Sequence, residues 1–231
     1  MPVFFAGESY ARSIAAALDI PLFTFSHQEG HIEAVKAFSK HSDGQEILAC
    51  HFSGGTSELL HVIDNGHGYD IEIVGGSKDI AFGQVIDRAG VAMGMRFPAG
   101  EEMDKLALDS KEISNILTPV KVKEGWLNLS GIDTQMKRAL EDSNTGSLSM
   151  LTTELFTKLS DAMCAMISDA VRQTGINNVI MAGGVSSSRF MRERITEKLT
   201  SSETDVEFSS GELSQDNAIG VAVLGGKQIW E

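Results

Sequence analysis

Residues 178–189 read NVIMAGGVSSSR: an apolar run, then the pair Gly183–Gly184, then three serines and an arginine. An apolar run of this length that ends in glycines is typical of a buried strand, and we expect a helix from Ser186 to about Leu199. A strand that turns through glycines into a helix is typical of α/β folds. The free N–H groups at such a helix start can bind an anion or a nucleotide, but the pattern also fits an ordinary tight turn.

Strand-like and helical patterns alternate on either side of this stretch. Three strand-like runs come first, separated by the turns SGGT and NGHG, of which the second is a strong hairpin signal. Ahead of them we expect a helix over Glu8–Leu18, a strand at LFTFS (22–26) and a helix over 27–40. This mixed order predicts an α/β fold with a layered sheet. The expected strands are 46–53, 57–64, 69–75, 178–182 and 205–209. The other expected helices are 79–94, 100–109, 134–142, 149–174 and 213–229, and residues 111–133 are expected to be irregular with strand-like stretches around Val120.

The composition excludes several classes of function. The 231 residues carry a formal charge of −13, which argues against a broad surface that neutralises nucleic-acid phosphates. The apolar runs are far shorter than the ~20 residues of a membrane span, and we expect no signal peptide. The two cysteines, Cys50 and Cys164, cannot form a disulfide framework and are expected in the core. We therefore expect a reduced, cytoplasmic setting.

The segment HQEGH (27–31) places two histidines at positions i and i+4. On a helix both imidazoles share one face, which is the geometry that a divalent metal needs from two ligands. The alternative is a solvated helix start with incidental histidines. Similarly, the backbone of SGG (53–55) can approach a phosphate or simply form a hairpin turn. Asp216 and Asn217 are either metal or phosphate ligands or helix N-caps.

The ordered set of motifs is more specific than any single one. It comprises HQEGH, SGG after a strand, QVIDRAG (84–90), FPAG (97–100), NLSG (128–131), MAGGVSSSR and QDNAIG (215–220). From about Ala6 to the C-terminus this set resembles the TsaD/Gcp family, whose older label is O-sialoglycoprotein endopeptidase, a glycoprotease. The resemblance implies the actin-like ATPase (ribonuclease H-like) fold of two α/β lobes. It also implies transfer of a threonylcarbamoyl group from its AMP ester to N6 of a tRNA adenosine.

The resemblance also assigns site residues. It implies a divalent metal, Fe or Zn, on His27, His31 and Asp216, with His51 as an additional candidate where some members carry a metal-binding tyrosine. It implies an adenine nucleotide or acyl-adenylate near two glycine turns and one helix. The implied nucleotide-binding residues are Ser53, Gly54, Gly55, Asp87, Gly100, Glu102, Gly183, Gly184 and Ser188. No general base can be named, and the other carboxylates considered, Asp79 and Asp104, are expected on solvated helix faces.

The chain departs from the family pattern at several positions. Thr56, Ser57 and Glu58 follow SGG, Ser188 replaces an asparagine, and a lysine-bearing motif ends in Asp133. The family's N-terminal part has no counterpart in this sequence. We therefore expect residues 1–44 to be the end of a first lobe with the metal-binding helix, and 45–231 to be a second, nucleotide-binding lobe.

Three functions stay open at this point. The first is a divergent or partial threonylcarbamoyltransferase that works with protein partners of the pathway, contacts tRNA only with those partners, and has no membrane partner. The second is a non-catalytic paralogue that acts as a scaffold or dimerisation partner, with a homodimer as one candidate assembly. The third is the metal-dependent glycoprotease, although the glutamate of HQEGH does not follow the first histidine as it does in HExxH.

Overall fold

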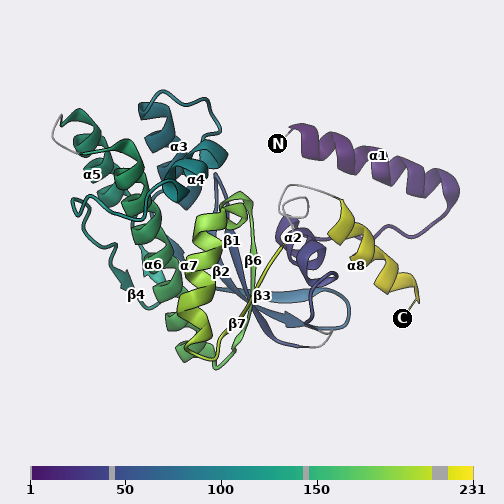
Figure 1. Ribbon diagram of the computed structural model, residues 1–231. Helices are drawn as coiled ribbons and strands as arrows, with labels where there is room; N and C mark the ends of the chain where they lie inside the picture. Colours follow the sequence, from purple (N-terminus) through teal and green to yellow (C-terminus); the bar gives the residue numbers. More distant parts are fainter. Residues whose placement is uncertain (1, 42–44, 143–145, 210–217, 231) are drawn as a thin grey trace.

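The computed structural model describes residues 2–41, 45–142, 146–209 and 218–230. Across these ranges seven strands form one sheet, in the order β4-β5-β3-β2-β1-β6-β7, with helices packed on both faces (Figure 1). The strands are β1 (Ile47–Phe52), β2 (Ser57–Asp64), β3 (Tyr69–Ser77), β4 (Val122–Lys123), β5 (Trp126–Leu127), β6 (Asn178–Ala182) and β7 (Asp205–Phe208). The predicted α/β layered sheet is confirmed.

The first three strands form an antiparallel meander. Asp64 pairs with Tyr69 across the NGHG turn, where the N–H of Asn65 donates to the carbonyl of Gly68 at 3.2 Å. Gly66 has φ +82°, a left-handed conformation that glycine adopts without strain. The predicted hairpin is therefore confirmed.

β6 runs parallel to β1 on one side and to β7 on the other. His51 of β1 pairs with Ala182 of β6, so both strands end at the same edge of the sheet. The turns SGGT and GGVS leave from this edge. Carboxyl ends of adjacent parallel strands are where ligands bind in open α/β sheets.

The face of the sheet with the larger core is covered by α3 (Phe82–Ala92), α4 (Gly100–Leu108), α5 (Ser130–Glu141), α6 (Leu148–Thr174) and α7 (Arg189–Thr200). Alternate residues of β1, Leu48, Cys50 and Phe52, point into this core. Cys50 and Cys164 are buried and free, and burial raises the pKa of the Cys164 thiol to about 11. Both cysteines are core residues, as predicted.

The opposite face is covered by α2 (His27–Lys36) and α8 (Ile219–Trp230). Ile32 of α2 and Leu224 of α8 share a buried cluster with Ile47, which alternates with the β1 residues of the other core. The helices touch at Gly30 and Gly220, where a Cβ added to Gly220 would lie 1.9 Å from the carbonyl oxygen of Gly30. This contact lets α8 lie directly against the helix that carries HQEGH.

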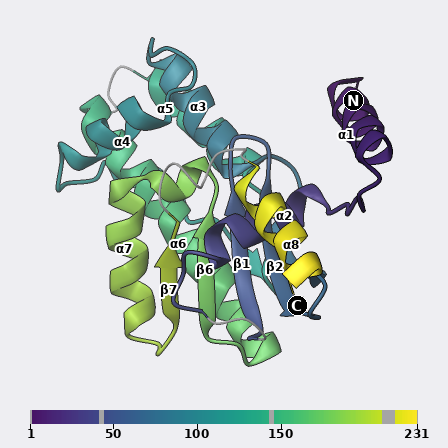
Figure 2. The same cartoon turned by 90° about the vertical axis from the view of Figure 1, so that its right-hand side faces the viewer.

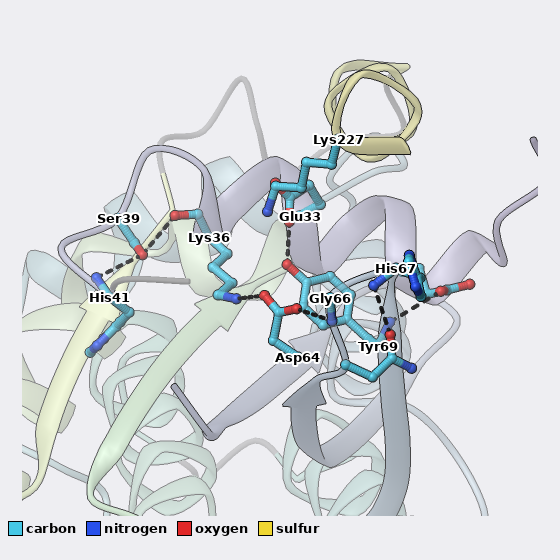
Figure 3. A network of polar contacts seen from close by, with 11 residues as sticks. Glu33, Lys36, Ser39, His41, Asp64, Gly66, His67, Tyr69 and Lys227 are labelled. Carbon is cyan, nitrogen blue, oxygen red and sulfur yellow. Dashed lines mark hydrogen bonds and ion pairs between the residues drawn. The ribbon is translucent and has the colours of Figure 1, made fainter. Parts of the chain in front are cut away.

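A buried network of charges joins α2, α8 and the β2–β3 hairpin (Figure 3). Glu33 and Lys36 of α2 are only 1% and 2% exposed, so each needs a partner of opposite charge. Glu33 pairs with Lys227 at 3.2 Å and accepts a hydrogen bond from the Tyr69 hydroxyl, while Lys36 pairs with Asp64 at 2.7 Å. Two positive and two negative charges thus compensate one another between three elements.

Helix α1 (Pro2–Leu18) confirms the predicted helix and starts earlier than Glu8. It stands apart from the sheet in both views (Figures 1 and 2). Its side chains Phe5 and Tyr10 are exposed. The predicted strand LFTFS was wrong, because residues 20–26 form no ladder with any described strand. Helix α2 ends at Lys36 rather than near residue 40.

Several other boundaries differ from expectation; α3, for example, begins at Phe82 rather than at residue 79. A 3₁₀ turn, η1 (Gly184–Ser187), precedes α7, which begins at Arg189 rather than Ser186. Helix α5 begins at Ser130 rather than at residue 134. The expected start of the last helix, residue 213, lies outside the described residues, and α8 is described from Ile219 onward. The proposed domain boundary falls on residues 42–44, which lie outside the described residues, and the division into lobes stays a prediction. None of the helices in the described ranges is long and apolar enough to cross a membrane.

The Gly30–Gly220 contact makes a prediction for stability. We expect Gly220→Ala to lower the free energy of unfolding by about 2–3 kcal/mol or more, because the new methyl would overlap backbone atoms that cannot move independently. Gly225→Ala, in the same helix and with no atom within 4 Å of the added Cβ, is the matched control. It should be neutral or stabilise by up to about 1 kcal/mol through helix propensity. Urea denaturation measures the free energy of unfolding of both variants. Equal changes in Gly220→Ala and Gly225→Ala would contradict a close contact at Gly220.

Candidate nucleotide and metal site

A cavity of about 560 Å³ opens beside the carboxyl ends of β1 and β6, on the side of α3, α4 and α7. Five residues predicted to bind the nucleotide line it: Gly54, Asp87, Gly100, Gly184 and Ser188. They come from four separate segments of the chain. The other lining residues are Gly83, Ile86, Phe97, Pro98, Glu101, Asp104, Phe156, Val185 and Ser187.

Two glycines bring together the segments that surround this cavity. Gly183 has φ +90°, and a Cβ there would lie 2.3 Å from the carbonyl oxygen of Phe52. A Cβ on Gly83 would lie 2.6 Å from the carbonyl oxygen of Ser53. Glycine at both positions allows the ends of β1 and β6 and the start of α3 to meet. Ser53 itself closes the SGGT turn, since its hydroxyl accepts from the N–H of Thr56 at 3.0 Å.

The remaining predicted nucleotide residues take different positions. Asp87 accepts the N–H of Ala99 at 2.8 Å, which ties α3 to the segment before α4 while Asp87 also lines the cavity. Ser53, Gly55, Glu102 and Gly183 are not among the lining residues. In α4 it is Glu101 and Asp104, not Glu102, that face the cavity.

Asp104 is a functional candidate, although it was predicted to lie on a solvated helix face. Its carboxylate accepts the backbone N–H groups of Arg189 at 3.0 Å and Phe190 at 3.2 Å, and the hydroxyl of Ser188. It therefore lies at the N-terminus of α7, where backbone donors have no partner within the helix. Helical spacing could have identified it, because Asp104 follows the cavity residue Gly100 by one turn.

The three predicted histidines lie together on the other side of β1. The Nε2 atoms of His27 and His31 are 3.1 Å apart, and the ring centroids of His31 and His51 are 4.8 Å apart. Two nitrogens bound to one tetrahedral metal at about 2.0–2.1 Å are roughly 3.3–3.4 Å apart. The spacing of His27 and His31 is therefore close to that of two ligands on one ion, and imidazole suits both Fe and Zn.

The set of metal ligands is not complete within the described ranges, where no three His, Cys, Asp or Glu side chains form a group that could hold a metal ion. Asp216, the third predicted ligand, lies outside the described residues. Ser26 and Glu29 form a capping box at the start of α2, and this box fixes the first turn of the helix that carries both histidines. In it the Ser26 hydroxyl accepts the N–H of Glu29 at 3.1 Å, and the Glu29 carboxylate accepts that of Ser26 at 2.6 Å.

Asp79 has a structural role. Its carboxylate accepts the N–H groups of Leu129 at 2.8 Å and Ser130 at 3.0 Å, and so caps the N-terminus of α5. Partial burial raises the pKa of Asp79, but hydrogen bonds from the Ser130 side chain and from three backbone N–H groups outweigh this and hold the pKa well below its usual value. The NLSG motif is thus anchored by a charged carboxylate.

The sheet order and the helices on both faces define the class of the fold. Similar solved structures include T.kodakarensis HypF, with 16% identity, a TM-score of 0.71, and coverage of 96% of this chain and 39% of that chain. Another is the activator of the 2-hydroxyisocaproyl-CoA dehydratase from Clostridium difficile with bound ADPNP, with 13% identity, a TM-score of 0.57, and coverage of 89% and 68%. These neighbours have the actin-like ATPase fold, and the predicted fold class is confirmed.

The sequence comparisons identify the family. The TsaD model, described as tRNA N6-adenosine threonylcarbamoyltransferase, matches residues 5–223, and the chain belongs to this family. The proteins of that name from Thermus thermophilus and Salinibacter ruber are 30% and 27% identical to it. The matches cover 94% and 96% of this chain, but 64% and 68% of those proteins. The chain thus spans about two thirds of their length.

The low pKa of Asp79 has a consequence for acid stability. Because the folded pKa lies below the unfolded value of about 3.9, the carboxylate stabilises the fold above that pH and the contribution is lost as the pH falls. Asp79→Asn should lower the free energy of unfolding at neutral pH by about 1 kcal/mol, a value limited by solvent exposure, and should flatten the decline of that free energy as the pH falls below about 4. Asp109→Asn, an exposed carboxylate at the C-terminal end of α4, is the control and should change neither quantity. A parallel decline in Asp79→Asn and the native chain would contradict the cap.

Proposed function

We propose that this chain contributes to transfer of a threonylcarbamoyl group from threonylcarbamoyl-AMP to N6 of an adenosine in tRNA. Membership of the family supports the proposal. The observation that carries it is the cavity, which collects Gly54, Asp87, Gly100, Gly184 and Ser188 from four separate motifs. A fold that needed only tight turns and caps would not direct all of them to one space.

In this proposal the cavity holds the adenylate and the histidines hold the metal. Backbone N–H groups at the SGG and GGVS turns face the phosphate, and the α3 and α4 residues contact the nucleoside. His27 and His31 provide two metal ligands, with His51 beside them and Asp216 as a proposed further ligand. When bound, the metal supplies Lewis-acid chemistry at the activated carbonyl. Gly220 supports the choice of Asp216, because it contacts the histidine helix at Gly30 and follows Asp216 by four residues.

The net charge of the chain indicates what kind of partner it needs to contact tRNA. With a net charge of −13 the chain offers little attraction for tRNA phosphates. We therefore propose that, in the cytoplasm, basic partner proteins of the same pathway bring the tRNA, and that bare tRNA binds weakly. A tight, salt-sensitive complex with bare tRNA would contradict this proposal. Self-association into a homodimer is a further proposal, which analytical ultracentrifugation tests directly.

Two alternatives are weighed against this function. A protease would need a glutamate on the metal site to activate water, but Glu29 is occupied by the capping box and its other oxygen accepts the N–H of Tyr69 at 3.4 Å. A non-catalytic scaffold is consistent with the unusual Thr56, Ser57 and Glu58. A measurement of transferase activity distinguishes the scaffold function from the transferase function.

The experiment is complementation. The chain is expressed in a strain that lacks its own threonylcarbamoyltransferase, and threonylcarbamoyladenosine in tRNA is measured by mass spectrometry. We expect the modification to return with the native chain and to fall at least tenfold with Asp87→Ala, while Asp109→Ala has no effect. If the native chain is present as folded protein and restores nothing, the scaffold function replaces this proposal.

The metal site makes a separate prediction. We expect His31→Ala to weaken binding of Zn²⁺ or Fe²⁺ roughly a hundredfold or more, because it removes one of two converging nitrogens. His61→Ala is the matched control, since His61 pairs with Glu46 at 3.1 Å on strand β2, outside the histidine cluster. Competition with a chromogenic chelator measures both affinities. Equal metal affinities in the two variants would show that the HQEGH histidines are not metal ligands.

A further inference from the structure

We infer that Glu58 supplies negative charge to a divalent cation on the HQEGH histidines without contacting the ion itself. The inference rests on the proposed metal site. It concerns a position at which this chain departs from the family pattern, the third residue after SGG. Three observations carry it: the strand pairing of Glu58, its hydrogen bond to the histidine helix, and its uncompensated charge.

The strand pairing places Glu58 beside the histidine cluster. His51 of β1 and Glu58 of β2 are direct partners in the antiparallel ladder. Directly opposite side chains lie on the same face of a sheet, with Cβ atoms about 4.5–5.5 Å apart. That face is the one that α2 covers, because the rings of His51 and His31 lie 4.8 Å apart between centroids. Glu58 therefore occupies the strand position next to a candidate metal ligand.

A hydrogen bond holds the carboxylate against the same helix. Gln28, which lies between His27 and His31 in the sequence, donates from Nε2 to Oε2 of Glu58 at 2.9 Å. Helix α2 thus meets the adjoining ends of β1 and β2 in two neighbouring contacts, His31 with His51 and Gln28 with Glu58. Both Gln28 and Glu58 are half-buried, so water screens the charge less than on an open surface.

The charge of Glu58 has no counter-charge until a cation binds nearby. None of the ion pairs formed among the described residues includes Glu58. The amide of Gln28 is neutral and leaves the negative charge in place. Histidines bind a metal as neutral imidazoles, so they bring no negative charge to a divalent ion. A carboxylate beside them lowers the energy of that ion.

Glu58 acts through space rather than as a ligand. In the part of the chain that the structure describes, it forms no metal-binding group of three side chains with the histidines. Its Oε2 atom already accepts the hydrogen bond from Gln28. Groups that surround metal ligands typically change the metal affinity about 10–100-fold when they are removed.

The test measures the Zn²⁺ affinity of the full chain by competition with a chromogenic chelator. Glu58→Gln keeps the size of the side chain and an oxygen that can accept from Gln28, but it removes the charge. We therefore expect this variant to bind Zn²⁺ about tenfold more weakly, and Glu58→Asp, which keeps the charge, to stay within about threefold of the native chain. Glu46→Gln is the matched control and should bind like the native chain, because Glu46 pairs with His61 at 3.1 Å outside the histidine cluster.

Two further measurements separate the charge from a structural role. Gln28→Met removes the hydrogen bond and leaves the charge of Glu58, so it should change the Zn²⁺ affinity less than about threefold. The visible absorption of bound Co²⁺ reports the ligands of the ion and should be the same in the native chain and in Glu58→Gln. Urea denaturation verifies that every variant is folded.

The inference is overturned if Glu58→Gln binds Zn²⁺ as tightly as the native chain, or if Gln28→Met weakens binding as much as Glu58→Gln does. A changed Co²⁺ spectrum in Glu58→Gln would make Glu58 a ligand and would also overturn it. The proposed histidine site survives each of these results as long as His31→Ala loses the metal. If the native chain binds neither ion, the proposed metal site itself fails, and the inference fails with it.

Discussion

The close approach of Gly183 to the carbonyl of Phe52 is the contact on which both halves of the site depend. It allows the ends of the parallel strands β1 and β6 to lie together, and the chain then leaves them in two tight turns. On one side of this junction is the cavity with its five predicted residues. On the other side, His51 on the same strand meets the histidines of α2. A side chain at position 183 would separate the strands and so affect both sides at once.

The second constraint is the orientation of α2. A helix of ten residues is too short to be stable alone, so tertiary contacts must fix its direction. Gly30 brings α8 into direct contact, and Glu33 and Lys36 connect the helix to the hairpin and to Lys227 through buried charges. A buried ion pair is weak evidence for stability, but the loss of one partner is strongly unfavourable. We interpret the network as a device that permits one docking geometry of the histidine helix.

The elements that were predicted correctly are those with local signals. The NGHG turn and the i,i+4 spacing of His27 and His31 act within a few residues, and the structure shows both as expected. The expected strand at LFTFS had the right residue types but needed a neighbouring strand, which local sequence cannot report.

The same distinction applies to the cavity. Its glycines and Asp87 followed from motifs, whereas the role of Asp104 depends on α7, more than eighty residues further along the chain. The choice of Glu102 over Asp104 would have required knowing which face of α4 turns inward. Asp216 is the opposite case. The sequence identifies it as a candidate metal ligand, but it lies outside the described residues.

The edges of the sheet have a consequence for how copies of this protein could meet. At one edge β4 has only two residues, Val122 and Lys123, and at the other β7 carries Asp205 and Glu207. Unpaired strand edges commonly recruit strands from neighbouring molecules, and short or charged edges resist this. In the described part of the chain, both edges thus resist growth of the sheet from molecule to molecule, and we expect any self-association to use helical surfaces.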